Sequence, residues 1–151
     1  GGFSAGGHAA ALWGTQMHGF RYYGMHAPEL IMLAYPLVSG KNIKNFLQTD
    51  AVEGMLKGMF GKDYTQEVAS HYYIDQNMDA AYPPVYVIQS EDDDTVPIRD
   101  SEDLVEALNC SQVRVVYEKL CSGGHGFGLG SNTSGKGWVE RAVNFWDELT
   151  K

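Results

Sequence analysis

The sequence predicts an α/β fold in which helices flank a parallel β-sheet. Two short runs of consecutive apolar residues, Leu30–Tyr35 and Val85–Ile88, have the composition of strands that are buried on both faces. Segments with helical periodicity lie before, between and after these runs, an alternation typical of parallel sheets. The length of 151 residues suits one ordinary domain, and 44% hydrophobic residues are enough to build its core.

The remaining elements follow from residue spacing and capping signals. A stretch rich in Ala and Leu begins near the first residue, and the last segment repeats large apolar side chains at helical spacing, which we interpret as core. In chain order we expect a helix over Ala5–Met17, a helix over Asp100–Leu108 with Asp100 as its N-cap, a strand over Val113–Tyr117, and a helix over Gly135–Leu149.

Between residues 42 and 80 the strand pattern is absent, and we expect a helical insertion that lies over one end of the sheet. Large apolar residues recur there at helical spacing, and Thr65 is a candidate start for a further short helix. The apolar face has two interpretations, simple packing or the lid of an acyl pocket, and both stay open. For the second interpretation the candidate pocket residues are Met55, Met59 and Phe60.

The net charge of −8 is concentrated in one window of the chain. Eight acidic residues and a single basic one, Arg99, lie between Glu91 and Glu106. Most of these acids are expected to form a solvated acidic surface. The charge disfavours nucleic acid or an anionic membrane as a partner, and no apolar run approaches the roughly 18 residues that a membrane span needs.

The two cysteines, Cys110 and Cys121, flank a stretch that is predicted to be a strand. An extended strand rises about 3.3 Å per residue and would hold the two sulfur atoms beyond disulfide distance. We therefore expect free thiols and a reducing, cytoplasmic location. No H-E-x-x-H or C-x-x-C motif is present, so neither a metal nor another cofactor is expected.

The first residues, Gly2-Phe3-Ser4-Ala5-Gly6, fit the G-x-S-x-G pattern of a nucleophile elbow. In such an elbow the serine occupies a sharp strand-to-helix turn, and the glycines avoid side chains where backbone segments come close. The pattern alone is weak, because it also arises by chance in Gly-rich turns. Here a helix-forming stretch follows at once, as the elbow requires.

An acidic loop and a histidine loop each follow a predicted strand. Asp92, Asp93 and Asp94 come after Val85–Ile88, and His125 lies in a Gly-rich loop after the next strand. The carboxyl ends of parallel strands meet at one edge of a sheet, where active sites of α/β proteins form. The chain order Ser, Asp, His is also that of an α/β-hydrolase triad, and this agreement is the strongest signal in the sequence.

These motifs resemble those of the serine esterases and lipases of the α/β-hydrolase superfamily, particularly the acetyl xylan esterase-like group. The matching stretches span the chain and are Gly2–His8, Asp93–Pro97 and Gly124–Leu129. In that family the triad acid lies four residues before the Pro of a Val-Pro pair, which selects Asp93. The resemblance implies Ser4 as nucleophile, His125 as general base and acid, Asp93 as its partner, and the Ala5 amide as an oxyanion donor.

The sequence departs from the family before the elbow. The family builds several strands there and takes a second oxyanion donor from an earlier loop, often His-Gly-Gly-Gly, whereas only Gly1 and Gly2 precede Phe3. We expect the C-terminal part of an α/β-hydrolase fold, lacking even the strand that leads into Ser4. An exposed sheet edge would then favour self-association and leave this chain weakly active or inactive.

The resemblance implies hydrolysis of a carboxylic ester, with a short acyl ester of a sugar or similar alcohol as substrate. Two alternatives stay open, namely a peptidase like the catalytic domain of prolyl oligopeptidase relatives, and a non-catalytic association module. The other histidines carry no paired ligand spacing: His8 is expected to pack and hydrogen-bond behind the elbow, and His18, His26 and His71 to be structural or exposed.

Overall fold

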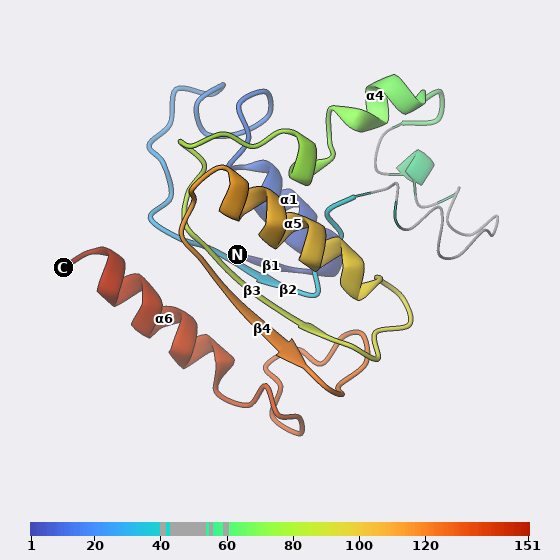
Figure 1. The fold of residues 1–151 in the computed structure, drawn as a ribbon. Helices are drawn as coiled ribbons and strands as arrows, with labels where there is room; N and C mark the ends of the chain where they lie inside the picture. Colours follow the sequence, from blue (N-terminus) through green and yellow to red (C-terminus); the bar gives the residue numbers. More distant parts are fainter. Residues whose placement is uncertain (40–41, 43–53, 55, 59–60) are drawn as a thin grey trace.

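The computed structural model describes residues 1–39, 42, 54, 56–58 and 61–151. Its centre is a parallel sheet of four strands whose order in the sheet is their order in the chain (Figure 1). The expected parallel sheet is thereby confirmed. The strands are β1 (Gly2–Phe3), β2 (Ile31–Ala34), β3 (Val85–Ser90) and β4 (Val115–Leu120).

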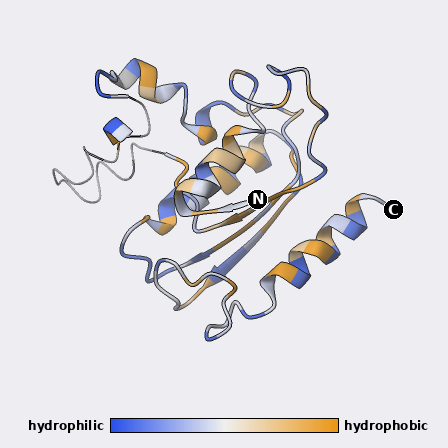
Figure 2. Cartoon of the chain, turned by 180° about the vertical axis from the view of Figure 1, so that it is seen from behind, coloured by the Kyte–Doolittle hydropathy of each residue, from blue (hydrophilic) through white to orange (hydrophobic). Residues whose placement is uncertain are grey.

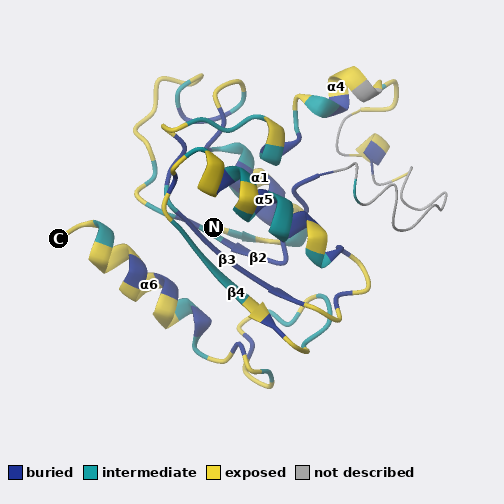
Figure 3. Cartoon of the chain, viewed as in Figure 1, coloured by how far each residue is buried: buried dark blue, intermediate teal, exposed yellow. Residues whose placement is uncertain are grey.

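Helices cover both faces of this sheet. Helices α1 (Ser4–Leu12) and α5 (Ile98–Cys110) lie on one face, and α6 (Trp138–Leu149) lies on the other (Figure 1). Successive residues of a strand point to opposite faces, so each strand supplies side chains to two separate cores. The two central strands, β2 and β3, are accordingly the most deeply buried (Figure 3).

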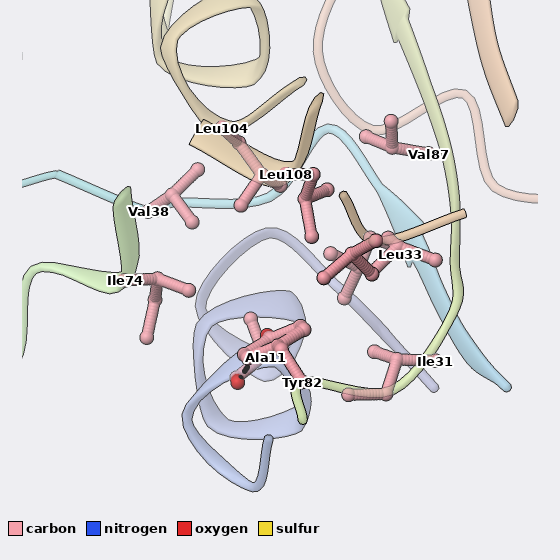
Figure 4. Close-up of a cluster of buried hydrophobic side chains, with 11 residues drawn as sticks. Ala11, Ile31, Leu33, Val38, Ile74, Tyr82, Val87, Leu104 and Leu108 are labelled. Atoms are coloured by element: carbon pink, nitrogen blue, oxygen red, sulfur yellow. Dashed lines mark hydrogen bonds between the residues drawn. The ribbon is translucent and has the colours of Figure 1, made fainter. Parts of the chain in front are cut away.

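The first core lies between the sheet and the helices α1 and α5 (Figure 4). Leu104 and Leu108 of α5 and Leu33 of β2 are fully or almost fully buried in it, and Ala11 brings α1 close to the strands. Its other buried members are Ile31, Val38, Ile74, Tyr82, Val85, Val87 and Val113.

The second core lies under α6, whose apolar residues gather on one side of the helix (Figure 2). Trp138, Ala142 and Phe145 face Tyr86 and Ile88 of β3. The helical spacing predicted these side chains as core; Phe145 is the buried aromatic, whereas the neighbouring indole of Trp146 is 39% exposed.

Several element boundaries differ from the sequence prediction. The expectation that no strand leads into Ser4 is wrong, because Gly2 and Phe3 pair with Leu33 and Ala34 of β2. Helix α1 ends at Leu12, well before Met17.

Two further corrections concern α5 and its neighbours. Helix α5 begins at Ile98, directly after Pro97, so Asp100 is not its N-cap but lies in its first turn. Strand β4 begins at Val115, because Val113 still belongs to the turn after α5, where its amide donates to the Leu108 carbonyl at 2.9 Å. Because the Val113 amide is bonded to the end of α5, it is not available for hydrogen bonds within the sheet.

Part of the segment between β2 and β3 folds into the short helix α4 (Gln66–Ser70) and the 3-10 helix η1 (Ile74–Gln76). Thr65 is the N-cap of α4, and its hydroxyl accepts a hydrogen bond from the Val68 amide at 3.2 Å, as the sequence predicted. Helix α4 lies apart from the sheet, whereas Ile74 joins the first core (Figure 1). That residues 42–80 form an insertion stays a prediction.

Cys110 and Cys121 are free and exposed. Within the described ranges, no helix has the length and apolarity to cross a membrane, and His, Cys, Asp and Glu side chains form no cluster that could hold a metal ion.

Candidate active site

Ser4 stands at a sharp turn between β1 and α1. It is the first residue of the helix and has a φ of 51°, a left-handed conformation that a side chain makes unfavourable. Gly2 makes this turn possible, because a Cβ atom there would lie 2.1 Å from the Gly6 carbonyl oxygen. The local geometry is that of a nucleophile elbow.

The second tight glycine of the turn is not the one that the motif suggested. A Cβ atom on Gly6 would meet no atom within 4 Å outside its own helix, whereas one on Gly7 would lie 2.9 Å from Cβ of Pro36. Gly7 therefore allows α1 to approach the segment that follows β2. Hydrogen bonds join the same two segments, from the Leu37 amide to the Ser4 carbonyl and between His8 Nδ1 and the Leu37 carbonyl.

The His8 side chain has the packing role that was expected. It is 7% exposed, and burial lowers its pKa, opposed by its hydrogen bond to the Leu37 carbonyl. A neutral ring with its proton on Nδ1 satisfies that carbonyl. His8 thus joins the helix behind the elbow to the segment that follows β2.

Asp93 follows β3 in a tight loop and its side chain is completely buried. One carboxylate oxygen, Oδ1, accepts hydrogen bonds from the Thr95 amide at 3.0 Å and from the Val96 amide at 2.8 Å. These backbone donors hold the carboxylate in one orientation. Among the three consecutive aspartates, Asp93 is therefore the one turned inward.

His125 connects Asp93 to Ser4. Its Nδ1 atom lies 2.9 Å from Oδ2 of Asp93, and its Nε2 atom lies 2.9 Å from Oγ of Ser4. With the proton on Nδ1, the ring donates to the carboxylate and accepts from the serine hydroxyl. The structure therefore brings together all three side chains that the sequence singled out, although Ser4 and His125 are 121 residues apart.

Gln89, in strand β3, forms a hydrogen bond with the Asp93 carboxylate and was not singled out from the sequence. Its amide nitrogen donates to Oδ2 of Asp93 at 3.2 Å and to the Val96 carbonyl at 2.7 Å, and its amide oxygen accepts from Ser101 at 2.5 Å. The signal that could have identified Gln89 is its place directly after the apolar run Val85–Ile88, because an amide buried there needs hydrogen-bond partners.

Tyr35 also borders the site without having been predicted. It follows β2 with a φ of 39°, and its ring centre lies 4.8 Å from that of His125 in an edge-to-face contact. The sequence placed it only as the last residue of an apolar run.

The remaining predicted site residues are not brought into this constellation by any described contact. Ala5 follows Ser4 in the first turn of α1, where backbone N–H groups have no acceptor within the helix. Its part as an oxyanion donor stays a prediction. Met55, Met59 and Phe60 lie outside the described residues.

The doubly covered parallel sheet and the turn at Ser4 are the architecture of an α/β hydrolase. The model of the prolyl oligopeptidase family matches residues 1–151, and the chain therefore belongs to this hydrolytic family. The expected α/β-hydrolase fold is confirmed by solved structures as well.

Two of those structures are esterases. The acetyl ester-xyloside bifunctional hydrolase from Caldicellulosiruptor lactoaceticus is 25% identical, with a TM-score of 0.80 over 99% of this chain and 55% of that one. The carboxylesterase Cest-2923 from Lactobacillus plantarum WCFS1 is also 25% identical, with a TM-score of 0.75 over 97% of this chain and 56% of that one.

A curated relative is the endo-1,4-beta-xylanase B of Butyrivibrio fibrisolvens, 22% identical over 111 residues. That match covers 74% of this chain but only 16% of the xylanase. The chain likewise spans a little over half of the two solved esterases.

Proposed function

We propose that the protein is a serine hydrolase that cleaves carboxylic esters with Ser4, His125 and Asp93 as its triad. The observation that carries the proposal is the hydrogen-bonded chain from Ser4 Oγ through the His125 ring to the buried Asp93 carboxylate. A serine hydroxyl is a weak nucleophile by itself and needs an adjacent base that a third group orients.

The reaction would proceed in two halves. Ser4 Oγ attacks the ester carbonyl while His125 Nε2 takes the hydroxyl proton, and Asp93 stabilises the imidazolium that forms. The Ala5 amide would donate to the developing oxyanion. The C–O bond of the ester then breaks, His125 returns the proton to the leaving alcohol, and Ser4 carries the acyl group. Water, activated in turn by His125, releases the acid and restores Ser4.

The substrate class that we propose is a short acyl ester, such as an acetylated sugar. It is supported by the names of similar proteins, an acetyl ester-xyloside hydrolase and a carboxylesterase, both 25% identical. A peptide substrate is the second candidate, favoured by the name of the matching family, prolyl oligopeptidase. Turnover of p-nitrophenyl acetate against the matching p-nitroanilide separates the two candidates.

The test is covalent labelling by a fluorophosphonate, which reacts only with an activated serine. Although ester turnover by this chain is expected to be weak, we expect wild type to be labelled, because labelling requires only an activated Ser4. Ser4→Ala should be unlabelled, and the control Ser131→Ala, at an exposed loop position, should react like wild type. In ester hydrolysis, loss of Ser4 or His125 should lower kcat on the order of 10⁶-fold, and loss of Asp93 on the order of 10⁴-fold. An unlabelled wild type would remove the proposal and favour the non-catalytic association module.

A further inference from the structure

We propose that Asp92 and Tyr35 are positioning residues that hold the two ends of the loop carrying His125. We call Ser122–Gly130 the histidine loop. The inference rests on the proposed function, because it assigns these residues a part in orienting the triad histidine. The sequence analysis assigned neither side chain a part in the site, because the resemblance selected Asp93 over Asp92 and Tyr35 was only the last residue of an apolar run.

The histidine loop is rich in glycine residues, which favour no single backbone conformation. Four of its glycines have left-handed φ angles, 63° at Gly124, 83° at Gly126, 57° at Gly128 and 68° at Gly130. Glycine reaches this region freely, but it also leaves the backbone the most conformations to choose from. The position of the His125 ring therefore depends on contacts from outside the loop.

Asp92 makes such contacts where the loop begins. Its Oδ1 atom accepts hydrogen bonds from the Gly123 amide at 2.9 Å and from the Gly124 amide at 2.8 Å. The same oxygen accepts from the Ser90 hydroxyl at the end of β3. The Ser90 hydroxyl and the two amides lower the pKa of Asp92, so its carboxylate is charged near neutral pH.

The two neighbouring aspartates thus contact different parts of the histidine loop. Asp93 orients the ring of His125, and Asp92 holds the backbone that precedes His125 by one and two residues. Both carboxylates follow the same strand, β3. The His125 ring and the backbone before it are therefore positioned relative to the same strand. Within the described part of the chain, the Asp92 carboxylate forms no hydrogen bond with the ring itself.

Tyr35 holds the other end of the loop. Its hydroxyl accepts a hydrogen bond from the Gly128 amide at 3.1 Å, and its ring packs against His125 and, at 4.7 Å between centroids, against Phe127. Trp138 completes this end, because its indole N–H donates to the Gly128 carbonyl at 3.0 Å. Both polar groups of the Gly128 backbone are therefore bound by buried aromatic side chains.

The first experiment compares Asp92→Ala, Asp92→Asn and the control Asp94→Ala. Asparagine keeps an oxygen that can accept all three hydrogen bonds made by Oδ1, whereas alanine removes it. Asp94 carries the same charge two positions further along the chain, and among the described residues it accepts a hydrogen bond only from the Thr95 hydroxyl. Two readouts are needed, the rate of fluorophosphonate labelling and the downfield proton resonance of the His125 Nδ1–H bonded to Asp93.

We expect Asp92→Ala to slow labelling on the order of 10²-fold, the cost typical of a misplaced catalytic group, and to broaden or abolish the downfield resonance. Asp92→Asn and Asp94→Ala should keep both close to wild type. In ester hydrolysis the loss should fall on kcat, with KM unchanged, because Asp92 is proposed to act through His125 alone.

The second experiment tests Tyr35 with Tyr35→Phe, which keeps the ring and removes the acceptor for the Gly128 amide. Its control is Tyr117→Phe, because the Tyr117 hydroxyl is buried without a hydrogen-bond partner among the described residues. We expect slower labelling and a weakened downfield resonance for Tyr35→Phe only.

The outcomes separate the two proposals. If wild type keeps the downfield resonance but is not labelled, the hydrolase proposal fails while the resonance still reports on loop positioning. If Asp92→Ala matches Asp94→Ala in both readouts, Asp92 does not position His125. If Asp92→Asn is as impaired as Asp92→Ala, charge and not hydrogen bonding is responsible, which also overturns the inference.

Discussion

At the scale of single residues, Ser4 combines the proposed reactive hydroxyl with an unfavourable backbone. Its φ of 51° is left-handed, a conformation that costs a residue with a Cβ atom about 1–2 kcal/mol. The surrounding turn enforces it, since β1 is paired with β2 and the Ser4 carbonyl accepts from the Leu37 amide. Strain of this kind is typical of functional turns.

Replacing Ser4 by glycine or alanine measures this strain. Both variants lose the hydroxyl, but only glycine removes the Cβ atom, so Ser4→Gly should unfold with a free energy roughly 1 kcal/mol higher than Ser4→Ala. Urea unfolding followed by circular dichroism gives the difference. Equal stabilities would mean that the turn stores no strain at Ser4.

The buried environment of Asp100 could not be predicted from the sequence. Its carboxylate is fully buried and accepts from the Val38 and Ser39 amides at 2.8 and 3.0 Å, and from Asn42 at 3.0 Å. Burial raises its pKa to about 7, although the three hydrogen bonds act in the opposite direction. The acid therefore couples protonation to folding.

The pH dependence has a definite sign. In the unfolded chain the carboxyl of Asp100 loses its proton near pH 4, whereas the folded protein keeps it up to about pH 7. The stability linked to this proton is complete below about pH 4 and is lost as the pH rises to about 7. Relative to Asp100→Asn, wild type should become less stable across that window, as measured by urea unfolding at several pH values.

The control for that series is Asp147→Asn, at an exposed position of α6. Its stability should follow that of wild type at every pH. A difference between wild type and Asp100→Asn that stays constant from pH 4 to 7 would show that Asp100 is ionised in the folded protein throughout.

At the scale of elements, the turn from β1 into α1 depends on where backbone segments meet. Gly2 faces the Gly6 carbonyl and Gly7 faces Pro36, whereas Gly6 itself faces open space outside its helix. The motif contains Gly2 and Gly6 as equals, but the packing makes them unequal. The close approach at Gly2 is between two backbone segments, which cannot move aside as a flexible side chain can.

A matched pair of variants tests this inequality. Gly2→Ala should destabilise the fold by about 1–3 kcal/mol or more, because its Cβ atom would overlap the Gly6 carbonyl. Gly6→Ala should leave stability unchanged or raise it by up to about 1 kcal/mol, since alanine is the better helix former. Thermal unfolding of both proteins decides the matter, and equal losses would contradict the packing at this turn.

At the scale of the whole molecule, the sheet has β1 at one edge and β4 at the other. Phe3, in the two-residue strand β1, is 44% exposed. Unpaired edge backbone can add a strand from another chain. Self-association through the β1 edge therefore stays our prediction for this protein.

Sedimentation velocity over a range of concentrations tests it. We expect species heavier than one chain, which Phe3→Lys should reduce because a charge at the edge disfavours strand addition. The control Val143→Lys places the same charge on the exposed face of α6, where Val143 is 41% exposed, and should leave association unchanged. A single-chain species at every concentration would rule the prediction out.

Local patterns of the sequence were sufficient for most of the elements, though not for β1, and for the three central site residues. Apolar runs predicted β2 and β3, helical spacing predicted α6, and the order of Ser4, Asp93 and His125 agreed with one sheet edge. These features depend on neighbouring residues or on the rule that parallel strands end on the same side. Boundaries were less certain, because turns such as the one at Val113 depend on a hydrogen bond back to α5.

The supporting residues were decided only by the tertiary structure. Asp92 and Asp100 lie in the same acidic run as Asp93, yet Asp92 binds the histidine loop and Asp100 is buried against the segment after β2. Their partners are 31 and 62 residues away. A carboxylate's role depends on which donors the folded chain places beside it, and residue type and spacing along the sequence do not contain that information.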